Sequence, residues 1–142
     1  MIKIAIIARA KSEHSLYVML SALCALNCEY LRTTPRVPRL YASGTRYRRE
    51  TASSRRAHGN PSDCDEWLTI PEIRSVGAGD CEDLAAWRVA ELRQDGIAAR
   101  PQLREVRPGH WHVTVIYPDG TGEDPSRILV DQERARGAQE PP

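Results

Sequence analysis

The chain has 142 residues, of which 41% are hydrophobic and 27% charged, and its formal net charge is +1. This length suits one domain with a modest core, and we expect it to span residues 1–130. The near-neutral charge gives no general reason to expect a nucleic-acid partner. No apolar run is long enough to cross a bilayer, and the apolar stretch at residues 1–10 lacks a secretory cleavage pattern. We therefore expect a cytoplasmic protein with its four cysteines kept as thiols.

The first clear pattern is an apolar helix from about Ser12 to Leu31. Cys24 and Cys28 lie four residues apart on it, a spacing that could hold a metal. The sequence offers no second cysteine pair and no histidine cluster, so buried structural thiols are the favoured interpretation. Cys64 lies in a polar loop, and we assign it no role.

Residues 32–62 form a basic segment with the composition of a loop. From Arg32 to Arg56 the chain has eight arginines and one acid, Glu50. Tyr41 and Tyr47 lie among these arginines, a mixture that could hold RNA, single-stranded DNA or an acidic protein. We favour a solvated arm that wraps the domain, and an acidic partner is the next choice.

A second helix is predicted to begin at Cys81. A Gly-Ala-Gly break precedes Asp80, a residue type that caps helix N-termini, and Glu82 and Asp83 place negative charge in the first turn. A glycine followed by isoleucine at residues 96–97 predicts a Schellman ending. Residues at helical spacing are expected to share one buried face: Cys81, Leu84, Ala85, Val89 and Leu92.

Cys81 is the candidate nucleophile. A thiolate in the first turn gains from unpaired N–H groups and from the positive end of the helix dipole. The acids beside it in sequence act in the opposite direction, because like charge raises the pKa of a thiol. A histidinium or a bound metal ion would neutralise them.

The segment from His110 to Tyr117 alternates as a strand does, and the following Pro-Asp-Gly turn predicts a return through Glu123 and Asp124. This geometry could lay Asp124 beside a histidine, where it would fix the imidazole tautomer. His110 and His112 share one face of the strand. We choose His112, which is deeper in the strand, and keep His110 in reserve.

An acyl-transfer site also needs an oxyanion hole. The backbone N–H of Cys81 is one expected donor, and the indole of Trp67 is a candidate for the second. A core aromatic under the cysteine helix is the favoured interpretation of Trp67. The polar tail, residues 131–142, is expected to be frayed or disordered.

Two stretches resemble the pattern of bacterial transglutaminase-like cysteine proteases. In that pattern a Trp-x-Thr-x-x-Glu segment, here beginning at Trp67, precedes a Gly-Asp-Cys-Glu-Asp helix start, here residues 79–83. The likeness covers roughly Trp67 to Arg127. The whole chain also resembles small transglutaminase-like proteins of tailed bacteriophages, on residues 30–32, 40–41 and 44–47 and on the Glu-Asp-Pro-Ser-Arg ending.

The resemblance implies an α+β, papain-like fold in which a helix carrying the cysteine packs on a small antiparallel sheet carrying His and Asp. It also implies that Cys81 is the nucleophile, His112 the base and Asp124 the orienting acid, acting on a protein or peptide substrate. Some proteases of this kind bind calcium through acids flanking the cysteine, here Asp80 and Glu82. The short spacing from Cys81 to His112 departs from the pattern and leaves little room for substrate-binding insertions.

Two classes of function follow. The first is a thiol-dependent peptidase, amidase or transglutaminase, located in the host cytoplasm if a phage encodes it. The second is a catalytically silent fold that serves as a phage structural, adaptor or binding protein through the arginine-rich segment.

Overall fold

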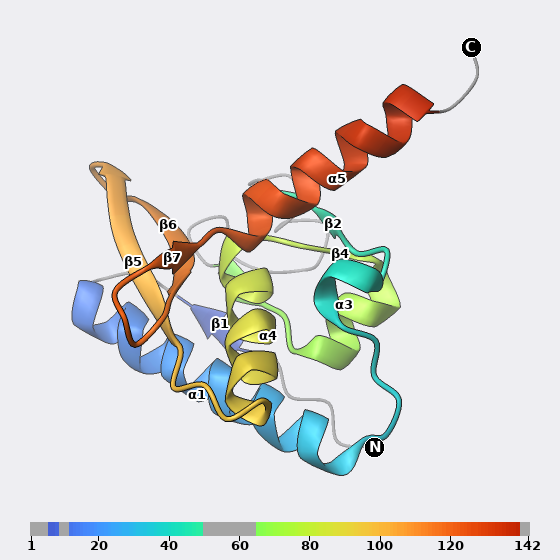
Figure 1. Cartoon of the computed structure of the whole chain (residues 1–142). Helices are drawn as coiled ribbons and strands as arrows, with labels where there is room; N and C mark the ends of the chain where they lie inside the picture. Colours follow the sequence, from blue (N-terminus) through green and yellow to red (C-terminus); the bar gives the residue numbers. More distant parts are fainter. Residues whose placement is uncertain (1–5, 9–11, 50–64, 140–142) are drawn as a thin grey trace.

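The computed structural model describes residues 6–8, 12–49 and 65–139, and it is a mixed α+β structure. Figure 1 shows one helix surrounded by the other elements. The helical elements are α1 (Glu13–Thr33), η1 (Leu40–Ala42), α3 (Ile70–Val76), α4 (Cys81–Gln94) and α5 (Pro125–Gln139). The strands are β1 (Ile6–Ala8), β2 (Arg46–Tyr47), β3 (Asp65–Trp67), β4 (Ala78–Gly79), β5 (Arg100–Arg107), β6 (His110–Ile116) and β7 (Gly122–Glu123).

Helix α4 lies at the centre, with α1 packed along it and β6 against it (Figure 1). Its start at Cys81 and its ending are as predicted. The N–H of Ile97 donates to the carbonyl of Leu92 (2.9 Å) and the N–H of Gly96 to that of Arg93 (3.0 Å), the two bonds of a Schellman motif.

The expectation of one buried face on α4 is too narrow. Leu84 and Trp87 belong to a cluster with α3, η1 and α5, whereas Cys81 and Val89 belong to another with α1 and β6. The helix is covered on nearly all sides, and even Glu91 is only 3% exposed. Its polar residues are therefore interior groups that need partners.

Helix α1 confirms the first predicted helix. Ser12 caps it by accepting a hydrogen bond from the N–H of Ser15 (3.1 Å), and its buried stripe packs on α4. Cys24 is fully buried in that stripe and Cys28 half-buried, and both are free thiols. Burial raises the pKa of Cys24 to about 12, as expected for a structural thiol.

The strand predicted from His110 is β6, the middle strand of an antiparallel sheet of order β5-β6-β7. Val113 and Val115 point into the core, as the alternation predicts. The Pro-Asp-Gly turn is also present, since the N–H of Gly120 donates to the carbonyl of Tyr117 (2.9 Å) and β7 returns beside the end of β6.

The described part of the basic segment, residues 32–49, is attached to the domain, and its first two residues belong to α1 rather than to a loop. It contributes η1 and β2, and β2 pairs in parallel with β4 directly before the cysteine helix. Arg39 pairs with Asp95 (2.7 Å) and Arg46 with Glu133 (3.6 Å). These ion pairs join it to the end of α4 and to α5, not to the acids beside Cys81. Cys64 and the rest of the segment lie outside the described residues.

The expectation of a frayed tail is wrong as far as residue 139, because α5 continues from Pro125 to Gln139 and projects outward (Figure 1). Two features hold its first half. Leu129 is 2% exposed in the core, and Glu133 forms the ion pair with Arg46. The sequence signal was weak because few apolar residues mark this helix. Within the described ranges, none of the helices combines the length and apolar character that crossing a bilayer requires.

Candidate active site

The start of α4 is built by two aspartates. The side chain of Asp80 accepts hydrogen bonds from the N–H of Cys81 (2.8 Å) and from the N–H of Asp83. Oδ2 of Asp83 in turn accepts from the N–H of Asp80 (3.0 Å), which completes a capping box. The other oxygen of Asp83 accepts from the N–H of Leu68 (2.7 Å) and so ties the end of β3 to the helix. A Cβ on Gly79 would lie 3.1 Å from that of Asp83, so glycine permits this close approach. These contacts explain three residues of the Gly-Asp-Cys-Glu-Asp sequence structurally: Gly79, Asp80 and Asp83.

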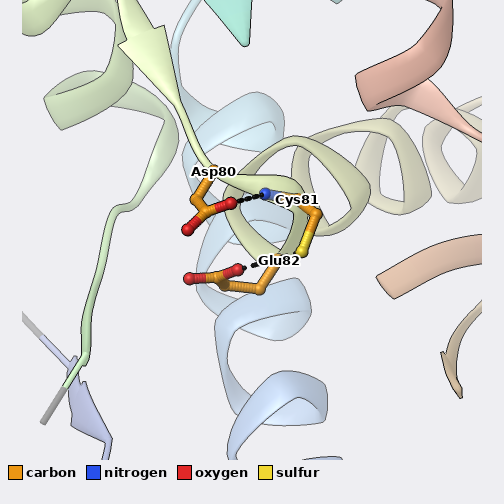
Figure 2. A group of neighbouring side chains, drawn as sticks. All are labelled: Asp80, Cys81 and Glu82. Atoms are coloured by element: carbon orange, nitrogen blue, oxygen red, sulfur yellow. Dashed lines mark hydrogen bonds between the residues drawn. The ribbon is translucent and has the colours of Figure 1, made fainter. Parts of the chain in front are cut away.

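The Cys81 thiol lies in the interior, with only 7% of the residue exposed. Its Sγ donates a hydrogen bond to Oε2 of Glu82 (3.3 Å), as Figure 2 shows, and receives one from the backbone of Val113 on β6. Burial raises the pKa of the thiol most, and the carboxylates of Glu82 and Asp80 raise it further. The arrangement therefore holds Cys81 as a protonated thiol: burial raises its pKa most, and the neighbouring acids act in the direction that the sequence suggested.

His112 and Asp124 are brought together. Nε2 of His112 lies 2.8 Å from Oδ2 of Asp124, and both side chains are partly exposed. Asp124 is also fixed from its other side, because Oδ1 accepts from the N–H of Arg127 (3.2 Å) at the start of α5. His110 lies at the exposed beginning of β6, paired with Arg107. Of the two histidines on this strand, the structure thus places His112 beside the acid.

Cys81 and His112 are neighbours through the backbone. The backbone group that contacts Sγ belongs to Val113, the residue after His112. The sulfur therefore lies beside the peptide bond between His112 and Val113. Within the described residues, no hydrogen bond joins the thiol to the imidazole, because the thiol donates its hydrogen bond to Glu82.

The oxyanion-hole expectations have mixed outcomes. The Cys81 N–H is already used, because Asp80 accepts it. Trp67 is 3% exposed in the same cluster as Cys81, in agreement with a packing role. Its indole N–H has no hydrogen-bond acceptor among the residues that the structure describes.

Asp80, Cys81 and Glu82 bring three potential metal ligands within 4.8 Å of one another. These residues do not fit calcium. Calcium takes about 6–8 oxygen ligands, whereas this group has one sulfur and two carboxylates, and one oxygen of each carboxylate already accepts a hydrogen bond within the group.

Tyr47 is a site residue whose location the sequence did not reveal. The pairing of β2 with β4 places it opposite Gly79, next to the start of α4. Burial, followed by the carboxylate of Asp80, raises the pKa of Tyr47 to about 12. A tyrosine among arginines suggested a surface for bases. In the structure it is instead half-buried beside the candidate nucleophile.

Comparisons of the whole chain with protein-family models, curated proteins and solved structures found no match.

Proposed function

We propose that the protein is a cysteine-dependent acyl-transfer enzyme of the peptidase, amidase or transglutaminase type, acting on a protein or peptide substrate. The observation that carries the proposal is the 2.8 Å contact between His112 and Asp124. The residue after His112 on β6, Val113, contacts the Cys81 sulfur through its backbone. A base oriented by a carboxylate and close to a thiol is the arrangement that nucleophilic catalysis needs.

In the proposed reaction, His112 donates its Nε2–H to Asp124, so Nδ1 is the nitrogen that takes a proton. The thiol leaves Glu82 and passes its proton to Nδ1, and the thiolate forms a bond to the substrate carbonyl carbon. The tetrahedral intermediate collapses with cleavage of the C–N bond, and the amine leaves with the proton from His112. Water or a second amine then attacks the thioester and releases Cys81.

The architecture supports a papain- or transglutaminase-like arrangement for this chemistry. A helix that begins at the cysteine packs on the middle strand of an antiparallel sheet, and the acid follows the last strand of that sheet. We further propose a cytoplasmic location, because the three described cysteines are free thiols.

The test is the alkylation of Cys81 by iodoacetamide, followed by mass spectrometry across pH. His112→Ala should slow labelling near neutral pH by about tenfold or more, because removing the base removes the proton acceptor. His110→Ala is the matched control, since it removes a histidine from the same strand without touching Asp124. Equal rates in the parent and both variants would refute the proposal.

The second candidate is a catalytically silent fold that binds an acidic partner, or serves as a phage structural or adaptor protein, through the segment from Arg32 to Arg56. Burial of Cys81 and its hydrogen bond to Glu82 favour it. Cys81→Ala separates the two. An enzyme would lose turnover and keep its fold, whereas a packing residue would chiefly lower the melting temperature.

A further inference from the structure

Glu123 is the centre of a partly buried polar cluster that lies beside the candidate site. Its carboxylate accepts hydrogen bonds from the hydroxyl of Tyr41 (2.5 Å), the hydroxyl of Tyr117 (2.6 Å) and Nε of Arg88 (2.6 Å). The donors come from η1, the end of β6 and α4. The arginine also lies over the ring of Tyr41, 5.1 Å from its centroid.

Glu123 immediately precedes Asp124 and is the last residue of β7. Backbone hydrogen bonds hold this strand only weakly. Strand β7 has only two residues, paired with Val115 and Ile116. Such a short strand gains little from its ladder, so side-chain contacts must fix where it lies. The carboxylate of Glu123 makes these contacts, and the position of the next residue follows from them.

The same carboxylate joins this strand to the helix of the candidate nucleophile. Arg88 lies on α4 about two helical turns beyond Cys81. The side chains of Arg88 and Glu123 are 15% and 16% exposed, so solvent screens their pair less than it screens a surface ion pair. A rigid link between α4 and β7 sets the distance from the thiol to the residues at the end of the sheet.

The hydrogen bonds outweigh the cost of burying the charge. Burial alone would raise the pKa of Glu123, but the donors, Arg88 first, bring the pKa below its ordinary value of 4.5. The group is therefore charged at neutral pH and accepts from its donors in the way that a positioning carboxylate requires.

We infer that Glu123 is a positioning residue: by anchoring β7 to α4 and β6, it holds Asp124 against His112. This inference rests on the proposed function for its catalytic meaning, but the geometry that it describes can be tested without a substrate.

The experiment measures solvent exchange of the ring N–H of His112 by NMR in ¹⁵N-histidine-labelled full-length protein. Asp124→Asn gives the exchange rate without the native acceptor. Glu123→Gln should accelerate exchange by about tenfold, towards that reference. Glu91→Gln is the matched control. It alters the second carboxylate that accepts from Arg88 (3.2 Å), one that is not attached to β7, and exchange should stay within about twofold of the parent.

Unchanged exchange in Glu123→Gln would overturn the inference, as would an equal acceleration in Glu91→Gln, because that would show general loosening. Should Glu123→Gln fail to fold, Tyr117→Phe decides, since it removes one hydrogen bond and keeps the ring. It should accelerate exchange by about threefold, and no acceleration would refute the inference. The iodoacetamide experiment reports on the enzyme and the exchange experiment on positioning, so the failure of one is distinguishable from the failure of the other.

Discussion

Replacing Glu82 by glutamine should lower the pKa of Cys81. Sγ and Oε2 are 3.3 Å apart, so a thiolate at this distance from a carboxylate would be disfavoured by about 5 kcal/mol at an effective dielectric constant of about 20, and by about 1.3 kcal/mol in bulk water. At about 1.36 kcal/mol per pKa unit, these limits correspond to a decrease of about one to four units. Removing the charge removes a cause that raises the pKa, so the thiolate fraction at a fixed pH must increase.

The assay is the pH profile of iodoacetamide labelling at Cys81, resolved by mass spectrometry. The midpoint of the profile reports the pKa even where burial slows the reagent at every pH. Asp80→Asn is the control, because asparagine remains a good N-cap and Asp80 raises the pKa of the thiol less than Glu82 does. Its midpoint should move down by less.

Cys24 gives an internal check on folding, since its buried thiol should stay unlabelled while the core is intact. An unchanged or higher midpoint in Glu82→Gln, with Cys24 protected, would refute the electrostatic reasoning. A larger shift in Asp80→Asn than in Glu82→Gln would do the same.

Three further predictions concern stability. Asp83→Ala should lower the free energy of unfolding by about 3–5 kcal/mol, measured in urea, because it leaves the N–H groups of Leu68 and Asp80 without this acceptor. Asp80→Ala should lower it by about 1 kcal/mol, and equal losses would show that Asp83 does not join β3 to the helix start. Because the fold lowers the pKa of Glu123, the charged carboxylate stabilises the protein fully above its unfolded pKa, and this stabilisation is lost as pH falls through the folded pKa. The difference in unfolding free energy between the parent and Glu123→Gln, measured in urea, should therefore shrink below about pH 4. Leu129→Ala should cost about 2–5 kcal/mol and speed hydrogen exchange along α5, and unaltered exchange would show that this leucine does not anchor the helix.

Features that depend on neighbours in the chain were predictable. The cap at Asp80, the ending at Gly96 and the turn after Tyr117 each involve residues within five positions, so residue type and spacing determine them. The alternation of β6 was readable for the same reason, because strand period alone places Val113 and His112 on opposite faces.

The polar interior was not predictable, because its partners are far apart in sequence. Glu123 meets Arg88 across 35 residues and Tyr41 across 82. Charged residues on a helix normally mark a solvated face, which concealed the burial of α4 on nearly every side. The available clue was that Arg88 and Glu91 interrupt an otherwise apolar stretch at residues 84–92, since such residues need buried partners once both sides of the helix are covered.

The position of the Cys81 proton is what separates the two proposed functions. The sulfur already contacts the backbone of Val113 on β6. In the proposed reaction the thiol exchanges its hydrogen bond to Glu82 for one to His112, and the sulfur stays against β6 while it does so. The contacts of Asp124 with His112 and Arg127 hold the imidazole's acceptor in place before that change. Catalysis and the labelling of Cys81 then both depend on the fraction of molecules in which the thiol has exchanged Glu82 for His112, because an oriented base gains nothing until it can take the thiol proton. A fold that only binds would keep the Glu82 contact in every state, and labelling of Cys81 would be indifferent to His112.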